Sequence, residues 1–237
     1  MTVQNIYQAV RCCYDEEAQN NANFVSASAG DMALMNNIIK AKIGDALRWI
    51  CLYAPAELLG GSDETSDGTE VPTGILVDMP ASGTLVPTTI AGTTGGYITT
   101  PANFIKLARI RVAGWHRAIK SPIEEDSEEY LQLYDENGAT ATAERPQAAI
   151  INKATKVIEV WPTGSSVQYT YVAEVNNTSA ESDTDGTTVI AIPPRAKTAF
   201  IYYLAFLVLS AYGDSLATRM LEIAKMNLGL TDDKQRA

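Results

Sequence analysis

Residues 197–213 have the sequence KTAFIYYLAFLVLSAYG, which is the most apolar run in the chain. Pro193 and Pro194 stand just before this run. Proline suits the first turn of a helix because the N–H that it lacks has no partner within the helix. Gly213 ends the run, and glycine tolerates the left-handed geometry in which many helices end. The stretch therefore predicts a helix that is apolar on every face, which is typical of a helix buried in a core or in a membrane.

The charged residues Lys197 and Asp214 bracket this helix closely. A helix that crosses a bilayer needs ~20 consecutive apolar residues, and shorter runs are more typical of protein cores. We therefore expect the central helix of a soluble protein rather than a membrane-spanning helix.

The composition is that of an ordinary globular protein, with 237 residues of which 46% are hydrophobic and 19% charged. A chain of this length can bury a sizeable core. The net charge of −10 argues against free nucleic acid as the main partner, because phosphate binding needs a basic surface. The same charge suits solubility, or a surface that lets DNA pass without binding it.

The three cysteines are Cys12, Cys13 and Cys51. Two are adjacent and the number is odd, so their spacing indicates neither a disulfide framework nor a metal site. The N-terminus lacks the basic and apolar regions of a signal peptide. We expect a protein that is made and kept in a reducing cytoplasm.

Amphipathic helices are predicted at both ends of the chain. An apolar stripe at helical spacing predicts a helix over residues 2–17, and a second stripe predicts a longer helix from Gly30 to the Ala54–Pro55 pair. Ser28 and Asp31 resemble a capping box at the start of this second helix. A last helix follows Asp214, its expected N-cap, and ends near Gly229.

The middle of the chain has a different pattern. Residues 60–100 are acidic and rich in glycine, threonine and proline, and they predict short edge strands and a mobile loop, either a projecting arm that touches neighbours or a surface insertion. Beyond them, alternation of polar and apolar residues predicts strands. These lie at residues 109–112, 157–161 and 167–172, with weaker candidates at 130–134 and 187–192.

The order of elements predicts an α+β fold in which two N-terminal and two C-terminal helices form one helical core around a β-rich insertion. The predicted segments are helices at 1–59, a loop or arm at 60–100, the β-rich insertion at 101–192 and helices at 193–237. Neither outer pair of helices can bury its apolar face alone, so we expect the two pairs to pack together.

The sequence shows no signature of an enzyme. His116 is the only histidine, so a catalytic triad or a histidine-based metal site is disfavoured. The glycine-rich run 92–96 lacks the lysine of a phosphate-binding loop. The acidic run 124–129 lacks the spacing of a calcium-binding loop. We therefore expect no catalytic residue, cofactor or metal.

Two charged groups are the candidates for contacts with other proteins. The basic residues from Lys106 to Lys120 include Arg109 and Arg111, which share one face if their strand alternates as predicted. They predict either contact with an acidic neighbour or the solvent face of a sheet. The candidate contact residues are Arg109, Arg111, Trp115, Arg117 and Tyr97. The candidate acidic patch, which would face a DNA channel or a basic partner, consists of Glu124, Glu125, Asp126, Glu128 and Glu129.

Several segments together resemble the head-to-tail connector proteins of tailed bacteriophages, also called neck, adaptor or ring proteins. These are the run 101–112 (PANFIKLARIRV), the following GWHRAI at 114–119, the acidic stretch with Tyr130, and the segment from Arg145 to Pro162. Pro193 and Pro194, which open the helix that carries YYLA, complete the resemblance. It covers residues 1–55 and 101–230, and within the group the chain is most similar to ring proteins of crAss-like gut phages.

The resemblance implies a structural, non-enzymatic protein of the virion, made in the bacterial host cytoplasm. It implies a ring of about twelve subunits docked under the portal around the DNA channel. The implied partners are other copies of the chain, the portal protein, other neck or tail proteins, and DNA that passes without specific binding, with no membrane. Two alternatives stay open: another phage structural part such as a tail-completion protein, and a small-ligand or carbohydrate-binding module.

Overall fold

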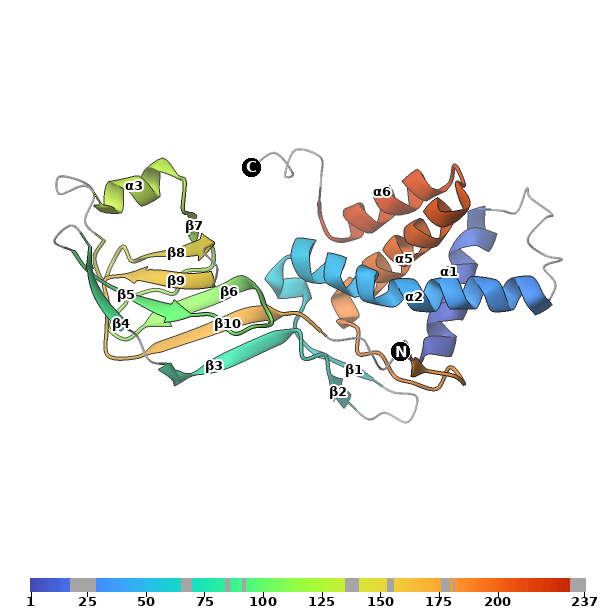
Figure 1. Cartoon of the computed structure of the whole chain (residues 1–237), viewed down its shortest axis with the longest axis horizontal. Coiled ribbons are helices and arrows are strands. Elements are labelled where there is room, and N and C mark those ends of the chain that lie inside the picture. The colour runs from blue at the N-terminus through green and yellow to red at the C-terminus, as the bar shows by residue number, and fades with distance from the viewer. Residues whose placement is uncertain are drawn as a thin grey trace. The chain divides into compact units, whose positions relative to one another are not determined.

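The computed structural model describes residues 1–17, 29–64, 70–83, 86–90, 93–134, 141–152, 156–175, 180 and 182–230. The chain divides into two compact units (Figure 1). The helical unit contains residues 1–75 and 174–237, and the β-rich unit contains residues 76–173. Both helices and sheets are present, so the predicted α+β class is confirmed. The predicted cap at Ser28 and the tail beyond residue 230 lie outside the described residues.

The helical unit is built from both ends of the chain. Its helices are α1 (Val3–Glu17), α2 (Ala29–Tyr53), α5 (Lys197–Tyr212) and α6 (Ala217–Asn227). Short 3-10 turns, η1 (Ala56–Leu58) and η2 (Pro194–Ala196), follow α2 and precede α5. A small antiparallel pair of strands, β1 (Ser62–Glu64) and β2 (Glu70–Pro72), completes the unit.

The apolar segment 197–213 forms α5, as predicted, and α5 is the centre of this unit. It packs against α1, α2 and α6, and it buries residues on several of its faces, among them Phe200, Leu204 and Val208. Gly213 ends the helix in left-handed geometry with φ of 69°. Among the described residues, no helix is long and apolar enough to cross a membrane.

Helix α1 buries the predicted stripe, since Val3, Ile6 and Val10 are inaccessible to solvent. The first N–H groups of a helix have no partner within the helix. Here the N–H of Val3 donates to the Thr188 carbonyl at 2.9 Å. The next N–H, that of Gln4, donates to the carbonyl of Gly186 at the same distance. The N-terminus of the chain is thus held by the segment that leads to α5.

The expected strand at 187–192 is wrong, because this segment forms only an isolated bridge between Val189 and Thr2. The last helix is confirmed, and it buries Ala217, Met220 and Ala224. The prediction of Asp214 as the N-cap is wrong, because the helix begins at Ala217 and its N-cap is Leu216. The Asp214 carboxylate instead accepts the N–H of Leu216 at 2.9 Å, in the turn that precedes the helix.

The β-rich unit contains two sheets. The three-stranded sheet has the order β3–β10–β6, from β3 (Leu76–Gly83), β10 (Val167–Ala173) and β6 (Phe104–Val112). The five-stranded sheet has the order β4–β5–β9–β8–β7, from β4 (Val86–Ile90), β5 (Thr93–Thr99), β9 (Lys156–Trp161), β8 (Gln147–Asn152) and β7 (Ile123–Glu124). Neighbouring strands are antiparallel except β7 and β8, which are parallel.

One face of each sheet contributes to a shared core. Leu107, Ile110 and Val112 of β6 belong to the same buried cluster as Ile158 and Val160 of β9. Residues i and i+2 of a strand point to one face. The two sheets therefore pack face to face as a sandwich, and each has an outer face directed away from this core.

The segment from Pro162 to Ser165 is a connection between the two sheets, since it leads from β9 in one to β10 in the other. At Gly164 the chain passes close to the end of β6. A Cβ atom there would lie 2.4 Å from the Ala113 carbonyl oxygen and 2.6 Å from a methyl carbon of Val112. Only a residue without a side chain fits, because real Cβ atoms do not approach other atoms so closely.

The predicted weak strand at 130–134 is wrong, because these residues belong to helix α3 (Glu128–Tyr134). Ser127 starts the helix: its Oγ accepts the N–H of Tyr130 at 3.1 Å. Tyr130 and Leu133 are three positions apart, and both pack on Trp161 and its neighbours. Leu131, by contrast, is exposed. The alternation that suggested a strand is therefore the apolar stripe of a short helix.

We predict that Gly164→Ala lowers the free energy of unfolding by about 1–3 kcal/mol, since the added methyl group overpacks the contact with Ala113 and Val112. Chemical denaturation followed by circular dichroism would measure the change. Ser165→Ala is the matched control in the same connection, and we expect it to change stability by less than about 0.5 kcal/mol because Ser165 is exposed. Equal stability of both variants would contradict the close packing at Gly164.

Candidate interaction surfaces

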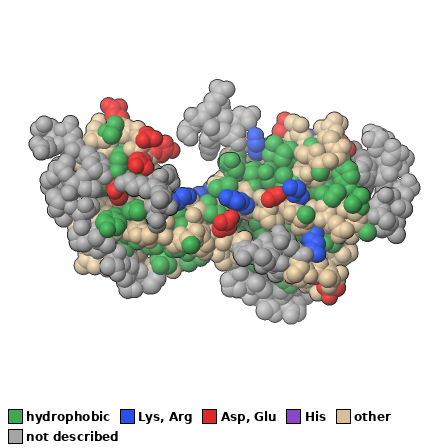
Figure 2. Space-filling model, viewed as in Figure 1, with side chains coloured by type: hydrophobic (Ala, Val, Ile, Leu, Met, Phe, Trp, Pro, Cys, Tyr) green, Lys and Arg blue, Asp and Glu red, His purple; other side chains and the backbone are tan. Residues whose placement is uncertain are grey.

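The acidic residues of the β-rich unit surround a tight turn between β7 and α3. The N–H and the hydroxyl of Ser127 both donate to the Glu124 carbonyl, at 3.1 and 2.7 Å. This turn leaves Glu124, Asp126, Glu128 and Glu129 exposed, whereas Glu125 is half-buried. Glu128 and Glu129 occupy the first turn of α3, where carboxylates interact favourably with the helix dipole. Figure 2 shows acidic side chains gathered on the visible face of this unit.

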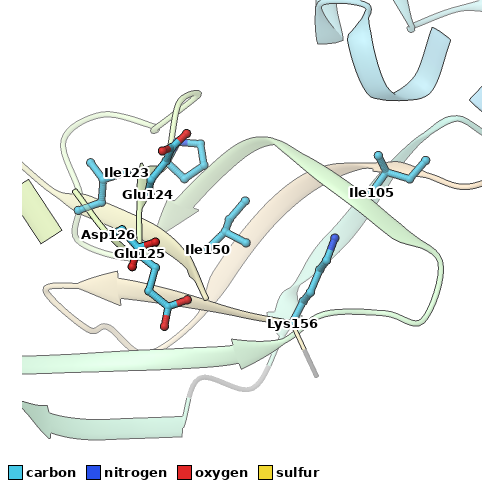
Figure 3. Close-up of a pocket in the computed structure, with 8 residues that line it drawn as sticks. Ile105, Ile123, Glu124, Glu125, Asp126, Ile150 and Lys156 are labelled. Atoms are coloured by element: carbon cyan, nitrogen blue, oxygen red, sulfur yellow. The ribbon is translucent and has the colours of Figure 1, made fainter. Parts of the chain in front are cut away.

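A groove of about 560 Å³ lies beside this turn (Figure 3). Its lining residues come from β6, β7, β8, β9 and the turn, and they combine aliphatic and charged side chains. They are Ile105, Pro122, Ile123, Glu124, Glu125, Asp126, Ile150 and Lys156. In Figure 3 the acidic side chains lie on one side of Ile150 and Lys156 lies on the other. The groove thus has an aliphatic wall, three carboxylates at one side and a single ammonium at the other.

Arg109 and Arg111 lie on the outer face of the three-stranded sheet, as their alternation predicted. Both are exposed, while Ile110 between them is buried in the core. Their cross-strand neighbours on β10 are Thr170 and Gln168. A second polar pair occupies this face, because the Thr170 hydroxyl donates to the Asp78 carboxylate of β3. The face is therefore polar, with the two guanidinium groups on the edge strand β6.

The acidic turn and the two arginines belong to different sides of the sandwich. Helix α3 packs on Ala149, Ile151 and Trp161, which are on the outer face of the five-stranded sheet. Arg109 and Arg111 are on the outer face of the other sheet. The β-rich unit therefore presents basic and acidic surfaces in different directions.

The other candidate contact residues have different surroundings. Trp115 is not on the surface: only 2% of it is exposed, and its indole N–H donates to the Pro162 carbonyl at 2.9 Å. Its role is in the core, and this corrects its interpretation as a contact residue. Arg117 is exposed, and Tyr97 of β5 is half-buried beside Glu159 of β9.

The described residues do not form a metal centre, because no three His, Cys, Asp or Glu side chains among them are grouped suitably for an ion. His116 is exposed, and its backbone N–H donates to the Ala143 carbonyl at 2.9 Å. Two effects raise the pKa of Tyr169: the larger is burial, and the smaller is the electrostatic effect of the nearby Tyr171. Hydrogen bonds that the Asp185 carboxylate accepts from Thr187, first from its hydroxyl and then from its backbone N–H, lower the pKa of Asp185. These shifts come from packing and from a local turn.

The helical unit carries an aromatic cluster formed by α2 and α5. Trp49 of α2 stacks on Tyr203 of α5, with ring centroids 4.0 Å apart. Two further rings extend the cluster: the Tyr53 ring centroid lies 5.8 Å from that of Trp49, and the Phe206 ring centroid lies 5.4 Å from that of Tyr203. Tyr53 is half-exposed, and Figure 2 shows hydrophobic side chains gathered on the visible face of the unit. Exposed apolar patches are typical of surfaces that contact other proteins.

The family model described as SU10 adaptor protein matches residues 1–237, the whole chain. No curated protein matches the chain.

We predict that Trp115→Ala lowers the free energy of unfolding by about 3–5 kcal/mol, as expected for removing a large buried side chain. Arg117→Ala is the control from the same segment, and we expect a change below about 0.5 kcal/mol because its side chain is exposed. Denaturant titrations of the two variants would measure both values. A Trp115→Ala protein with wild-type stability would show that Trp115 does not support the core.

Proposed function

The chain belongs to the SU10 adaptor protein family, whose members are phage structural adaptors of the virion, and from this premise we propose that it forms a ring at the phage neck. The ring has about twelve subunits and closes by repeating one head-to-tail contact. It sits between the portal and the tail, where it provides the passage for DNA and the attachment of the tail. Its partners are other copies of the chain, the portal protein and other neck or tail proteins.

The match to an adaptor family over the whole chain is the observation that carries this proposal. An adaptor joins other structural proteins, which is consistent with a protein that is not an enzyme. The sequence resemblance to ring proteins of tailed phages, including those of crAss-like phages, supports the ring form and the position at the neck.

The charge of the chain supports the passage of DNA. Each subunit carries a net charge of −10, and a ring multiplies this charge around a central channel. Phosphate groups are repelled by an acidic wall, so DNA can slide through such a channel without binding to it. Genomic DNA is therefore a transient occupant of the ring and not a specific ligand.

The surfaces described above support contacts with other proteins. The helical unit exposes Tyr53 at the edge of the aromatic cluster around Trp49. The β-rich unit presents separate basic and acidic surfaces. Several distinct surfaces are what an adaptor needs, because each subunit contacts two neighbours in the ring and further proteins above and below it.

We predict that the purified protein forms closed rings of about a dozen subunits, since a heterologous contact that closes on itself gives a fixed number of copies. Native mass measured over a range of protein concentrations, with electron micrographs of the same sample, would test this prediction. His116→Ala is a useful control, because an exposed histidine that has no catalytic role is not needed for assembly.

Particles of a different symmetry would favour another structural part, such as a tail-completion protein. A protein that stays monomeric at every concentration, and that also fails to bind the portal of the same phage, would contradict the proposed role.

A further inference from the structure

We propose that neighbouring copies of this chain contact each other through their β-rich units, with a basic face of one copy seated against an acidic groove of the next. The basic face consists of Arg109 and Arg111 on the outer face of β6. The acidic groove is the groove described above beside the β7–α3 turn, with Glu124, Glu125 and Asp126 along one side of its aliphatic wall. This contact rests on the proposed ring and specifies which surfaces close it.

The two surfaces follow from a separation of charge along the chain. Residues 101–121 contain five Lys or Arg residues and no Asp or Glu, whereas residues 122–136 contain seven Asp or Glu residues and no Lys or Arg. Arg109 and Arg111 lie on the outer face of the three-stranded sheet, whereas the acidic turn leads into α3, which packs on the outer face of the five-stranded sheet. Each copy therefore presents two opposite charges in two directions, which complement the charges of a second identical copy.

This arrangement favours a head-to-tail contact. A copy that places its basic face on one neighbour still has its acidic groove open for another. The same contact can then repeat from copy to copy, and it closes into a ring when the rotation between copies is constant and divides a full turn. Opposite charges also fix the order of the two surfaces, because basic against basic and acidic against acidic contacts are repulsive.

The groove fits an arginine side chain better than a simple acidic patch would. Ile105, Pro122 and Ile150 provide an aliphatic wall for the methylene groups of the side chain. The carboxylates at the rim can accept the planar, forked N–H groups of a guanidinium. Lys156, whose Nζ lies 6.0 Å from the centre of the Phe104 ring, contributes a positive charge to the groove. An arriving cation is therefore directed to the side of the groove that holds the carboxylates.

The basic face is suited to reach outward. Asp78 is the acidic residue in the same cross-strand row as Arg109, but it accepts the Thr170 hydroxyl on the strand between them. Two strand spacings separate the backbones at Asp78 and Arg109, about 10 Å in total. The guanidinium of Arg111 has one N–H directed to the Trp115 carbonyl oxygen at 3.4 Å. The remaining N–H groups of this exposed side chain are available to a carboxylate of a neighbour.

A charge-swap experiment tests this contact. One variant, Arg109→Glu with Arg111→Glu, has a reversed basic face; the other, Glu124→Lys with Asp126→Lys, has a reversed groove. Each variant alone opposes like charges at every contact, and we expect the protein concentration for half-assembly to rise about 10-fold or more. An equimolar mixture of the two variants restores opposite charges at every contact, so we expect rings in which the two variants alternate. Such rings contain an even number of subunits.

Native mass spectrometry of the mixture would show the alternation directly. Arg195→Glu with Arg219→Glu is the matched control on the helical unit, and we expect it to assemble like the wild type. Thermal melts of all variants should coincide with that of the wild type, so that loss of assembly is not loss of folding. Wild-type assembly should also weaken between low salt and about 1 M salt, where the screening length is only about 3 Å.

Two results would overturn the inference, and they differ in what else they overturn. Wild-type rings with unchanged assembly of both charge-reversed variants would place the contact elsewhere and leave the proposed ring intact. The same conclusion follows if the mixture of variants fails to assemble. A wild-type protein that forms no ring in either salt would overturn this contact together with the self-assembled ring on which it rests.

Discussion

Burial of α5 is the constraint on which the helical unit depends. This helix has no polar face to turn to water, so other elements must cover it on several sides. The elements that do so are α1, α2 and α6, which come from both ends of the chain. The middle segment, residues 76–173, can then form a unit of its own without interrupting this core. The division of the chain into two units follows from this one buried helix.

The β-rich unit solves a different problem, which is to hold charged groups in fixed directions. Its core joins the inner faces of two sheets, and close contacts at Trp115 and Gly164 fix how the chain passes from one sheet to the other. Side chains on the outer faces cannot turn inward without placing charge in the core, which is costly. The sandwich therefore holds Arg109 on one side and the acidic turn on another in fixed positions.

Several weak contacts that form at the same time can hold a structural adaptor in its position within an assembly. Exposed ion pairs contribute little individually, typically about 0–1 kcal/mol. In a closed ring every copy makes the same contact twice, and breaking the ring requires the loss of two contacts for each copy released. Modest charge complementarity between β-rich units can therefore support assembly without the large apolar interface that would make single chains aggregate.

The sequence by itself determined the features that depend on neighbours in the chain. The periodicity of residues 2–17 and the apolar run at 197–213 predicted helices, because residues three or four positions apart lie on one face of a helix. The alternation around Ile110 likewise placed Arg109 and Arg111 on one face. Local pattern failed at 130–134, where a short apolar alternation fits a strand and a helical stripe equally well. Only packing against Trp161 decided between them. The burial of Trp115 and the groove were also decided by tertiary structure, since Ile105, Ile123, Ile150 and Lys156 meet only when strands distant in sequence pair in one particular order.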